Sequence, residues 1–260
     1  MIQNLTVRGK TDGFGCQLNA KLSGIAYCRK HDDCYRYVHT PFTTVSHGWT
    51  SKEDADRLNQ FIGIPDNRNE YRIDCNKKYG CASVYKWPYN YYTHDTLDYI
   101  REMYWSTSKP KNAETEMVAH IRRGDVQWQN GGDRRRRYVR NFWYNISLQK
   151  LFELYPDNYR LTIHSEGDMS EFESIMDGWS QDLVERTVWK LATDGNSNDQ
   201  NNAIVAFHEM VTAKVLLGSK SGFSYCAGLY NEGDFFFLPS GAKGQSQGLF
   251  HWKAAKKLCD

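Results

Sequence analysis

A chain of 260 residues with 40% hydrophobic and 25% charged residues has the composition of a globular protein, with room for one large domain or two ordinary ones. Its formal net charge of +2 does not indicate nucleic-acid binding, and we expect none. No stretch approaches the ~20 apolar residues of a transmembrane helix, and the first residues lack the regions of a signal peptide. The 7 cysteines show neither zinc-ligand spacing nor a disulfide framework, so we expect a reduced, cytoplasmic protein.

The first part of the chain begins with a pattern of strand, glycine loop, helix and strand. Leu5-Thr6-Val7 predicts a strand, and Gly13-Phe14-Gly15 predicts a tight loop before a helix. The further elements that we expect here are a helix over 17–31, a strand over 34–38, and helices over 53–61 and 93–105. Such an opening is typical of a nucleotide-binding half-domain.

The second part of the chain alternates more clearly between strands and helices. The expected strands are 117–121, 160–164, 184–188, 215–218 and 235–238, and the expected helices are 138–154, 169–177, 201–213 and 223–230. This alternation indicates a mainly parallel sheet. The polar, proline-containing segment 108–112 is the expected linker. We therefore predict an α/β protein of two domains, 1–110 and 111–260, with a cleft between them.

The segment from His120 to Asp125 reads His-Ile-Arg-Arg-Gly-Asp and follows an apolar run. The pattern places Arg122 and Arg123 at the carboxyl end of a strand, the edge at which open α/β sheets bind ligands. Guanidinium groups bind phosphate oxygens in a bidentate manner and stay charged. The segment predicts an anion site, for which phosphate is the natural ligand; a surface cluster of salt bridges is the alternative on these six residues alone.

Two further turns have the composition of phosphate-binding loops. Gly13-Phe14-Gly15 precedes a helix, and the free N–H groups of a helix N-terminus bind anions, although a plain tight turn explains the same residues. The segment 218–224 follows an apolar strand and opens another helix, where Ser221 can cap the helix or the backbone can bind a diphosphate. Neither turn has the spacing of a dinucleotide fingerprint or a P-loop.

Together these segments resemble the motifs of the fucosyltransferases that carry an H-x-R-R-x-D sequence. Residues 120–125 match that sequence in full, and residues 13–17 resemble the glycine-rich N-terminal motif of the family. Residues 220–225 are similar to the third family motif, and residues 163–168 are loosely similar to its intermediate acidic turn. The four segments occur in the family's order, whereas residues 40–112 have no clear counterpart.

The resemblance implies a glycosyltransferase of the GT-B type with two Rossmann-like domains. Residues 1–110 would lie on the acceptor side, and residues 111–260 would bind a nucleotide sugar for transfer to a glycan. No cofactor and no essential metal are implied, because the arginines supply the positive charge. Asp54-Ala55-Asp56 has the form of the D-x-D metal motif of another transferase fold, but it lies in a helical pattern, and we interpret it as a solvated helix face.

One departure from the family leaves the donor open. Relatives commonly carry an acidic residue that pairs with guanine N1 and N2 at the position where this chain has Ala206. Unpaired buried donors cost ~1–3 kcal/mol, which is enough to discriminate between bases. We therefore expect a UDP-sugar such as UDP-xylose, or GDP-fucose with guanine bound by another group such as Glu209.

In this interpretation Arg122 and Arg123 bind the donor phosphates, His120 positions the donor and Asp125 orients the arginines. The predicted donor-binding residues are Gly13, Phe14, Gly15, Gln17, His120, Arg122, Arg123, Asp125, Glu166, Glu209, Ser221, Gly222, Phe223 and Ser224.

The predicted catalytic residues are Asp12, Asp133, Arg122 and His120. Asp12 is preferred to Asp133 as the general base because the adjacent glycine loop would hold it more rigidly, and the transfer would invert the anomeric centre. The alternative is a non-catalytic nucleotide-sugar or glycan-binding module on the same fold. The complete H-x-R-R-x-D segment favours the enzyme.

Overall fold

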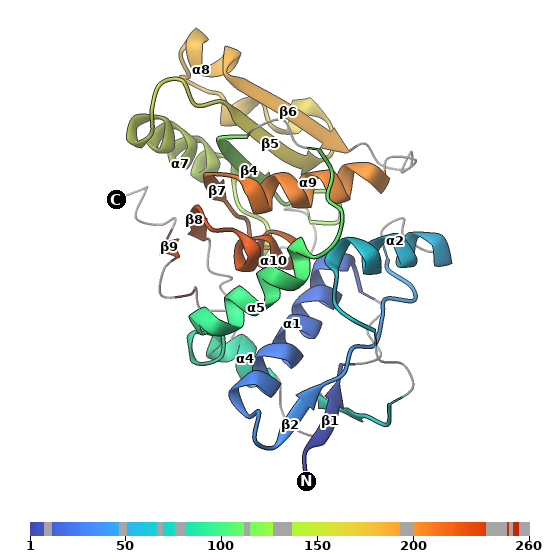
Figure 1. Ribbon diagram of the computed structural model, residues 1–260. Helices are drawn as coiled ribbons and strands as arrows, with labels where there is room; N and C mark the ends of the chain where they lie inside the picture. Colours follow the sequence, from blue (N-terminus) through green and yellow to red (C-terminus); the bar gives the residue numbers. More distant parts are fainter. Residues whose placement is uncertain are drawn as a thin grey trace. The chain divides into compact units, whose positions relative to one another are not determined.

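The computed structural model describes residues 1–7, 12–46, 51–66, 70–75, 82–111, 115–126, 137–192, 200–237, 249 and 252–254. The chain divides into two compact units between Pro110 and Lys111, except that Leu249 groups with the first unit. Each unit contains a parallel sheet and helices, whose labels follow Figure 1. The predicted α/β fold class is therefore confirmed.

The first unit contains a three-stranded parallel sheet in the order β2-β1-β3. Its strands are β1 (Gln3–Thr6), β2 (Tyr35–Tyr37) and β3 (Ile73–Asp74). Its helices are α1 (Phe14–Lys30), α2 (Lys52–Ile62), α4 (Ala82–Lys86) and α5 (His94–Trp105), with the 3-10 turn η1 (Pro88–Asn90). Leu5 of β1 lies in a buried cluster with Val7, Ala20, Cys28 and Cys75, which joins the sheet to α1.

Capping residues set the ends of α2 and correct one interpretation. Ser51 and Asp54 form a reciprocal capping box at its start, and Gly63, with a φ of 74°, ends it in the left-handed conformation. Asp54 is buried by this arrangement, so the Asp54-Ala55-Asp56 segment is not simply a solvated face. Asp56 is half exposed and pairs with Lys52.

The second unit contains a six-stranded parallel sheet in the order β6-β5-β4-β7-β8-β9. Its strands are β4 (Met117–Ile121), β5 (Leu161–Glu166), β6 (Thr187–Ala192), β7 (Val215–Leu217), β8 (Asp234–Phe237) and β9 (Lys253–Ala254). From β4 the chain adds β5 and β6 on one side, and it then adds β7 on the other side of β4. This reversal is a topological switch point, where open α/β sheets bind ligands at the carboxyl ends of their strands.

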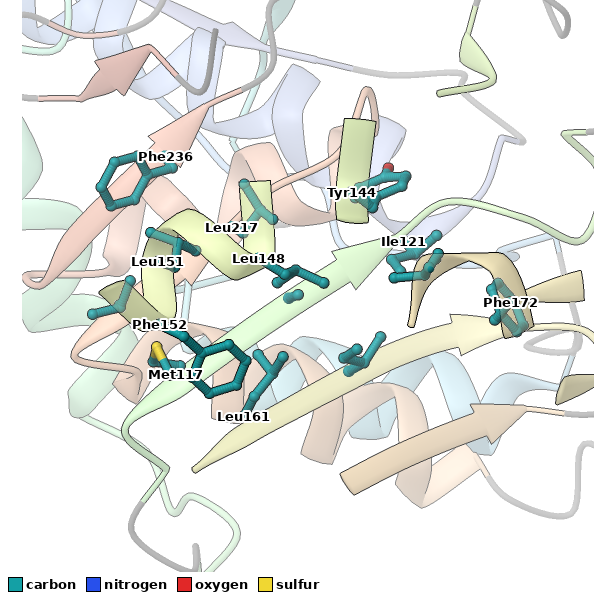
Figure 2. Packing of buried hydrophobic residues seen from close by; sticks show 14 of the residues in the cluster. Met117, Ile121, Tyr144, Leu148, Leu151, Phe152, Leu161, Phe172, Leu217 and Phe236 are labelled. Carbon is teal, nitrogen blue, oxygen red and sulfur yellow. The ribbon is translucent and has the colours of Figure 1, made fainter. Parts of the chain in front are cut away.

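The two faces of this sheet differ because successive strand residues point to opposite sides. Met117, Ala119 and Ile121 pack against α7 (Asn141–Leu154) in the apolar cluster of Figure 2. Each fully buried Leu, Ile or Phe there contributes about 1.5–3 kcal/mol. The opposite face carries His120 and His164, which contact α10 (Gly222–Tyr230) and α9 (Gln200–Thr212) respectively. This second face therefore holds buried polar side chains between the sheet and two helices.

Two predicted elements of the second unit are wrong. The helix expected over 169–177 is a pair of 3-10 turns, η2 (Met169–Glu171) and η3 (Glu173–Ile175). The strand expected over 184–188 is displaced to β6, because Ser180 caps a short helix, α8 (Gln181–Glu185), over its first residues. The short strands β3 and β9 were not predicted, since two residues carry no readable periodicity.

The cysteines require a further correction. Cys75 is disulfide-bonded, whereas Cys16, Cys28, Cys34 and Cys226 form no disulfide. Disulfides persist in oxidising compartments. The expectation of a fully reduced protein is therefore wrong. The cysteines no longer support the expected cytoplasmic location. Among the described residues, no helix has both the length and the apolar character that a membrane span requires.

Candidate functional site

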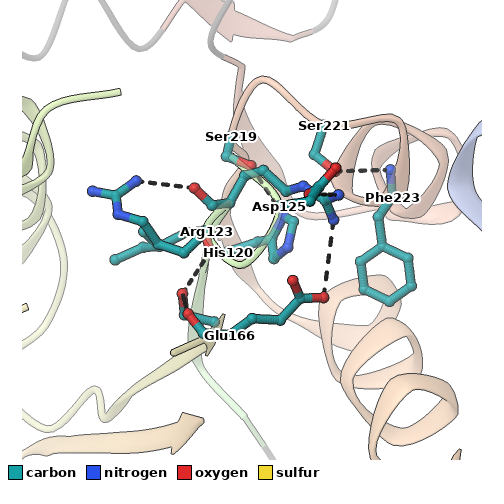
Figure 3. Close-up of polar contacts among 10 residues, drawn as sticks. His120, Arg123, Asp125, Glu166, Ser219, Ser221 and Phe223 are labelled. Carbon is teal, nitrogen blue, oxygen red and sulfur yellow. Dashed lines mark hydrogen bonds and ion pairs between the residues drawn. The ribbon is translucent and has the colours of Figure 1, made fainter. Parts of the chain in front are cut away.

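Two loops meet at the switch point of the second unit, one after β4 and one after β7 (Figure 3). The Nδ1 atom of His120 lies 3.1 Å from the hydroxyl oxygen of Ser219. The imidazole also packs against Phe223 in the first turn of α10, with 5.5 Å between the ring centroids. The structure thus brings together the segments 120–125 and 218–224, which the sequence singled out separately.

His120 is a neutral group in this site. Burial, reinforced by the positive charges of Arg122 and His164, lowers the pKa of His120 to about 3. A general acid or base needs a pKa near the working pH. His120 is therefore suited to hydrogen bonding and positioning, in line with the role expected for it, and not to proton transfer near neutral pH.

Arg122 follows β4 directly and is held by two carboxylates. It forms an ion pair with Asp125, and its Nη1 atom lies 4.0 Å from a carboxylate oxygen of Glu166 at the end of β5. In the same loop, Gly124 has a φ of 67°, and a Cβ atom at this residue would collide with the Glu166 carboxylate. The Arg122 side chain is 19% exposed, so its guanidinium is oriented by the protein while remaining accessible.

Arg123 takes a different direction from its neighbour. Its side chain is directed away from Ser221 and Phe223 in Figure 3 and is 1% exposed. The guanidinium donates to the carbonyl oxygens of Arg122 and Val139, at 2.9 and 3.0 Å, and to the side chain of Asn141. These contacts make Arg123 a structural residue that anchors the loop to α7, so the structure does not support its expected contact with donor phosphate.

The loop after β7 uses its own hydroxyl groups to set its shape. The Ser221 hydroxyl caps α10 by accepting the N–H of Phe223 at 3.2 Å. The buried Ser224 hydroxyl accepts the N–H of Ser219 at 3.2 Å. Gly222 is the first residue of α10. The two serines therefore fix the loop, and the positive end of the α10 dipole lies at the same sheet edge as Arg122.

Glu209 is not placed to bind a nucleotide base. Its carboxylate is 4% exposed, and its two oxygens lie 2.7 Å from Nε2 of His164 and 2.6 Å from Nζ of Lys190. Burial acts to raise the pKa of Glu209, but the hydrogen bonds and charges of His164 and Lys190 outweigh it and hold that pKa below its ordinary value. The suggestion that Glu209 reads guanine is therefore corrected: it links α9 to β5 and β6.

The remaining described candidates belong to the first unit. Gly13 is the N-cap of α1, and Phe14 and Gly15 form its first turn. Gln17 is buried, and its amide donates to the carbonyl oxygens of Asp12 and Thr44 at 2.7 and 2.8 Å, so it braces the loop.

The two candidate bases have different outcomes. Asp12 is exposed, and its carboxylate accepts a hydrogen bond from the Cys16 thiol at 3.2 Å. Asp133 lies outside the described residues. Neither role is tested by these positions, and both remain predictions.

Sequence reasoning missed several residues that hold the site. Ser219 and His164 were visible only as members of the segments 218–224 and 163–168, whereas nothing local marks Asn141 or Lys190, whose partners lie elsewhere in the chain. Within the described ranges, no three His, Cys, Asp or Glu side chains gather as metal ligands. Transfer without a metal stays a prediction.

Comparisons with known proteins identify no family for this chain and a weak structural likeness. No protein-family model matches the chain. No curated protein matches it either. Among solved structures, it is similar to a FUT1 mutant of Arabidopsis thaliana in complex with GDP, with a TM-score of 0.41 and 10% identity over 95% of this chain and 73% of that chain. A likeness of this strength carries no argument about function, which therefore depends on the site described above.

Proposed function

We propose that this protein is a glycosyltransferase that binds a nucleotide-diphosphate sugar in its second unit and transfers the sugar to a glycan hydroxyl. The observation that carries the proposal is the meeting of the β4 and β7 loops at the switch point, joined by His120 and Ser219. This junction puts the Arg122 guanidinium and the N-terminus of α10 on one sheet edge.

Both groups suit a diphosphate. A guanidinium binds two phosphate oxygens at once, and a helix N-terminus offers N–H groups and a partial positive charge. Charge that is already in place where a leaving diphosphate develops its negative charge is usually the largest catalytic contribution. Asp125 and Glu166 orient Arg122, and a bound phosphate would share the guanidinium with them or displace them.

For the donor, the proposal favours a UDP-sugar such as UDP-xylose over GDP-fucose. Ala206 is buried on α9 and offers no side-chain acceptor, and the Glu209 oxygens already bind His164 and Lys190. Titration calorimetry with GDP and UDP on the whole chain tests this choice. Clearly tighter binding of GDP would overturn the UDP version and leave fucosyl transfer in its place.

The proposed chemistry is an inverting displacement without a metal, in which an aspartate takes the acceptor proton. Asp12 is the first candidate because its carboxylate is exposed beside the N-cap of α1, and Asp133 is the second. Asp12→Asn and Asp133→Asn should therefore differ in turnover. The variant that removes the base should lose turnover and keep nucleotide binding. Full turnover in both variants would exclude both residues, and activity that EDTA abolishes would contradict metal-free transfer.

The deciding experiment measures nucleotide binding and slow donor hydrolysis together. Arg122→Ala should weaken binding of UDP or GDP about 10- to 100-fold, since one charge-assisted bidentate contact is lost. Arg160→Ala, at an exposed arginine before β5, is the matched control and should bind as the unchanged protein does. Nucleotide binding without any donor hydrolysis would favour the non-catalytic module, and unaltered binding by Arg122→Ala would refute the proposed site.

A further inference from the structure

A hollow lies in the second unit between α7 and the turn η3, and it is lined by none of the proposed donor-binding residues. It has a volume of about 370 Å³ and is lined by Phe142, Asn145, Ser174 and Asp177. Ligand pockets typically have volumes of ~300–1,000 Å³, so this hollow is large enough for one ring-sized group. Its lining combines one aromatic ring with amide, hydroxyl and carboxylate groups.

The aromatic wall is unusually exposed. The Phe142 side chain is 62% exposed, and the adjacent Trp143, 45% exposed, packs edge-on against it with 5.7 Å between the ring centroids. Two neighbouring aromatic side chains that are exposed on one helix turn leave apolar surface in contact with water, which is unfavourable and adds nothing to the core. The Phe142 ring, which lines the hollow, presents an apolar face on which the C–H groups of a planar or chair-shaped ligand can pack.

The polar wall is held in place by hydrogen bonds. The side-chain amide of Asn145 is buried and donates to the carbonyl oxygen of Asp177 at 2.8 Å, and its own oxygen accepts from Gln149. The amide of Asn141 donates to the Ser174 hydroxyl at 3.0 Å. These bonds fix the Ser174 hydroxyl and the backbone of Asp177 against α7, and the Asp177 carboxylate lines the hollow from that turn.

Charge narrows the choice of ligand. Among the described residues that line the hollow, Asp177 alone is charged, and it is acidic. A carboxylate accepts hydrogen bonds from hydroxyl groups and repels phosphate, sulfate and uronate groups. An apolar ring face beside a carboxylate and a hydroxyl matches a neutral pyranose, which has C–H groups on one face and hydroxyl groups around its edge.

We infer that the hollow formed by Phe142, Asn145, Ser174 and Asp177 is a binding subsite for one unit of a neutral saccharide. One residue connects the subsite to the segment 120–125. The Asn141 side chain donates a hydrogen bond to Ser174 and accepts one from the buried Arg123 guanidinium. That the saccharide belongs to the acceptor glycan is an extension that rests on the proposed function. The ligand chemistry of the hollow does not depend on it.

The test is NMR titration of the whole chain with four neutral hexasaccharides, built of glucose in β1,4 and α1,4 linkage, of xylose and of mannose. At least one should shift the Trp143 indole signal, and Phe142→Ala should weaken that binding about tenfold, as expected when an aromatic anchor is truncated. Asp177→Asn tests the polar wall and should also weaken binding. Trp105→Ala, at a 47% exposed tryptophan of the first unit, is the matched control and should bind normally.

The outcomes separate this subsite from the donor site. Failure of every hexasaccharide to bind, unchanged binding by Phe142→Ala, or tighter binding of a sulfated hexasaccharide would overturn the inference. If the saccharide binds but neither UDP nor GDP does, the proposed transfer fails and the subsite stands. If the nucleotide binds and no saccharide does, the subsite fails and the proposed transfer stands.

Discussion

His120 and Ser219 are 99 positions apart in the chain, yet their side chains lie within hydrogen-bonding distance, 3.1 Å between Nδ1 and Oγ. Both residues are buried. The bond ties the loop after β4 to the loop after β7, and it does so beside Arg122 and the first turn of α10. The two halves of the proposed phosphate site are thereby fixed to each other before any ligand binds.

Acid should destabilise the fold through its buried histidines. Burial and nearby positive charges lower the pKa of His120 and of His39 to about 3. Between that value and the ordinary 6.5, the unfolded chain binds more protons than the folded chain, so stability falls as pH falls through this window. The slope per histidine approaches ~1.4 kcal/mol per pH unit.

Urea unfolding of the unchanged chain and of His120→Asn, from about pH 4 to pH 7, measures this slope. The variant should show a flatter dependence on pH. The exposed His94 provides the control, since His94→Asn should retain the slope of the unchanged chain. An identical slope in all three proteins would show that His120 is not held neutral by the fold.

Replacing the two adjacent arginines should have opposite consequences. Arg123→Met leaves the Val139 carbonyl and the Asn141 side chain without their donor, so we expect a loss of about 3 kcal/mol in unfolding free energy. Arg122→Met removes a partly exposed ion pair worth ~0–1 kcal/mol, and it should instead lose nucleotide affinity. Urea unfolding and calorimetry on both variants give the comparison. A stable Arg123→Met protein that fails to bind nucleotide would place Arg123 in direct contact with the ligand.

The turn inside the H-x-R-R-x-D segment should not tolerate a side chain at Gly124. Its φ of 67° disfavours other residues, and an added Cβ would collide with the Glu166 carboxylate that faces Arg122. Gly178 is a matched control, because its φ is 77° and an added Cβ meets no atom within 4 Å. Gly178→Ala should cost about 1 kcal/mol from the backbone alone. Gly124→Ala should cost more and also weaken nucleotide binding, and equal effects would mean that the Glu166 contact is unimportant.

The buried carboxylate of Glu209 should be a strong determinant of stability. Glu209→Gln leaves His164 and Lys190 facing an uncharged amide, and removing one member of a buried pair costs ~3–5 kcal/mol. Because the pKa of Glu209 is lowered in the fold, its contribution is present above the ordinary pKa of a glutamate and is lost as pH falls through the lowered value. Thermal unfolding of Glu209→Gln near neutral pH should therefore give a lower Tm. An unchanged Tm would show that the ion pair contributes nothing.

The sequence by itself determined the class of fold and the position of the phosphate-binding candidates along the chain. Apolar strands that alternate with helices specify a parallel α/β sheet, because each signal is a local periodicity. The arginine segment directly after β4 and the Gly/Ser turn directly after β7 were therefore placed correctly at strand ends. Two local predictions changed because of helix capping. Ser180 caps a short helix where a strand was expected, and Asp54 is buried in a capping box.

Only the tertiary structure decided what each side chain does. Arg122 and Arg123 are adjacent and chemically identical, but one remains accessible beside carboxylates and the other is buried against α7. The sequence suggested Glu209 as a ligand-binding residue. In the fold its carboxylate binds His164 and Lys190, which are 45 and 19 positions away. Local patterns specify where a strand ends, whereas the partner of a buried polar group is set by packing between elements that are distant in the chain.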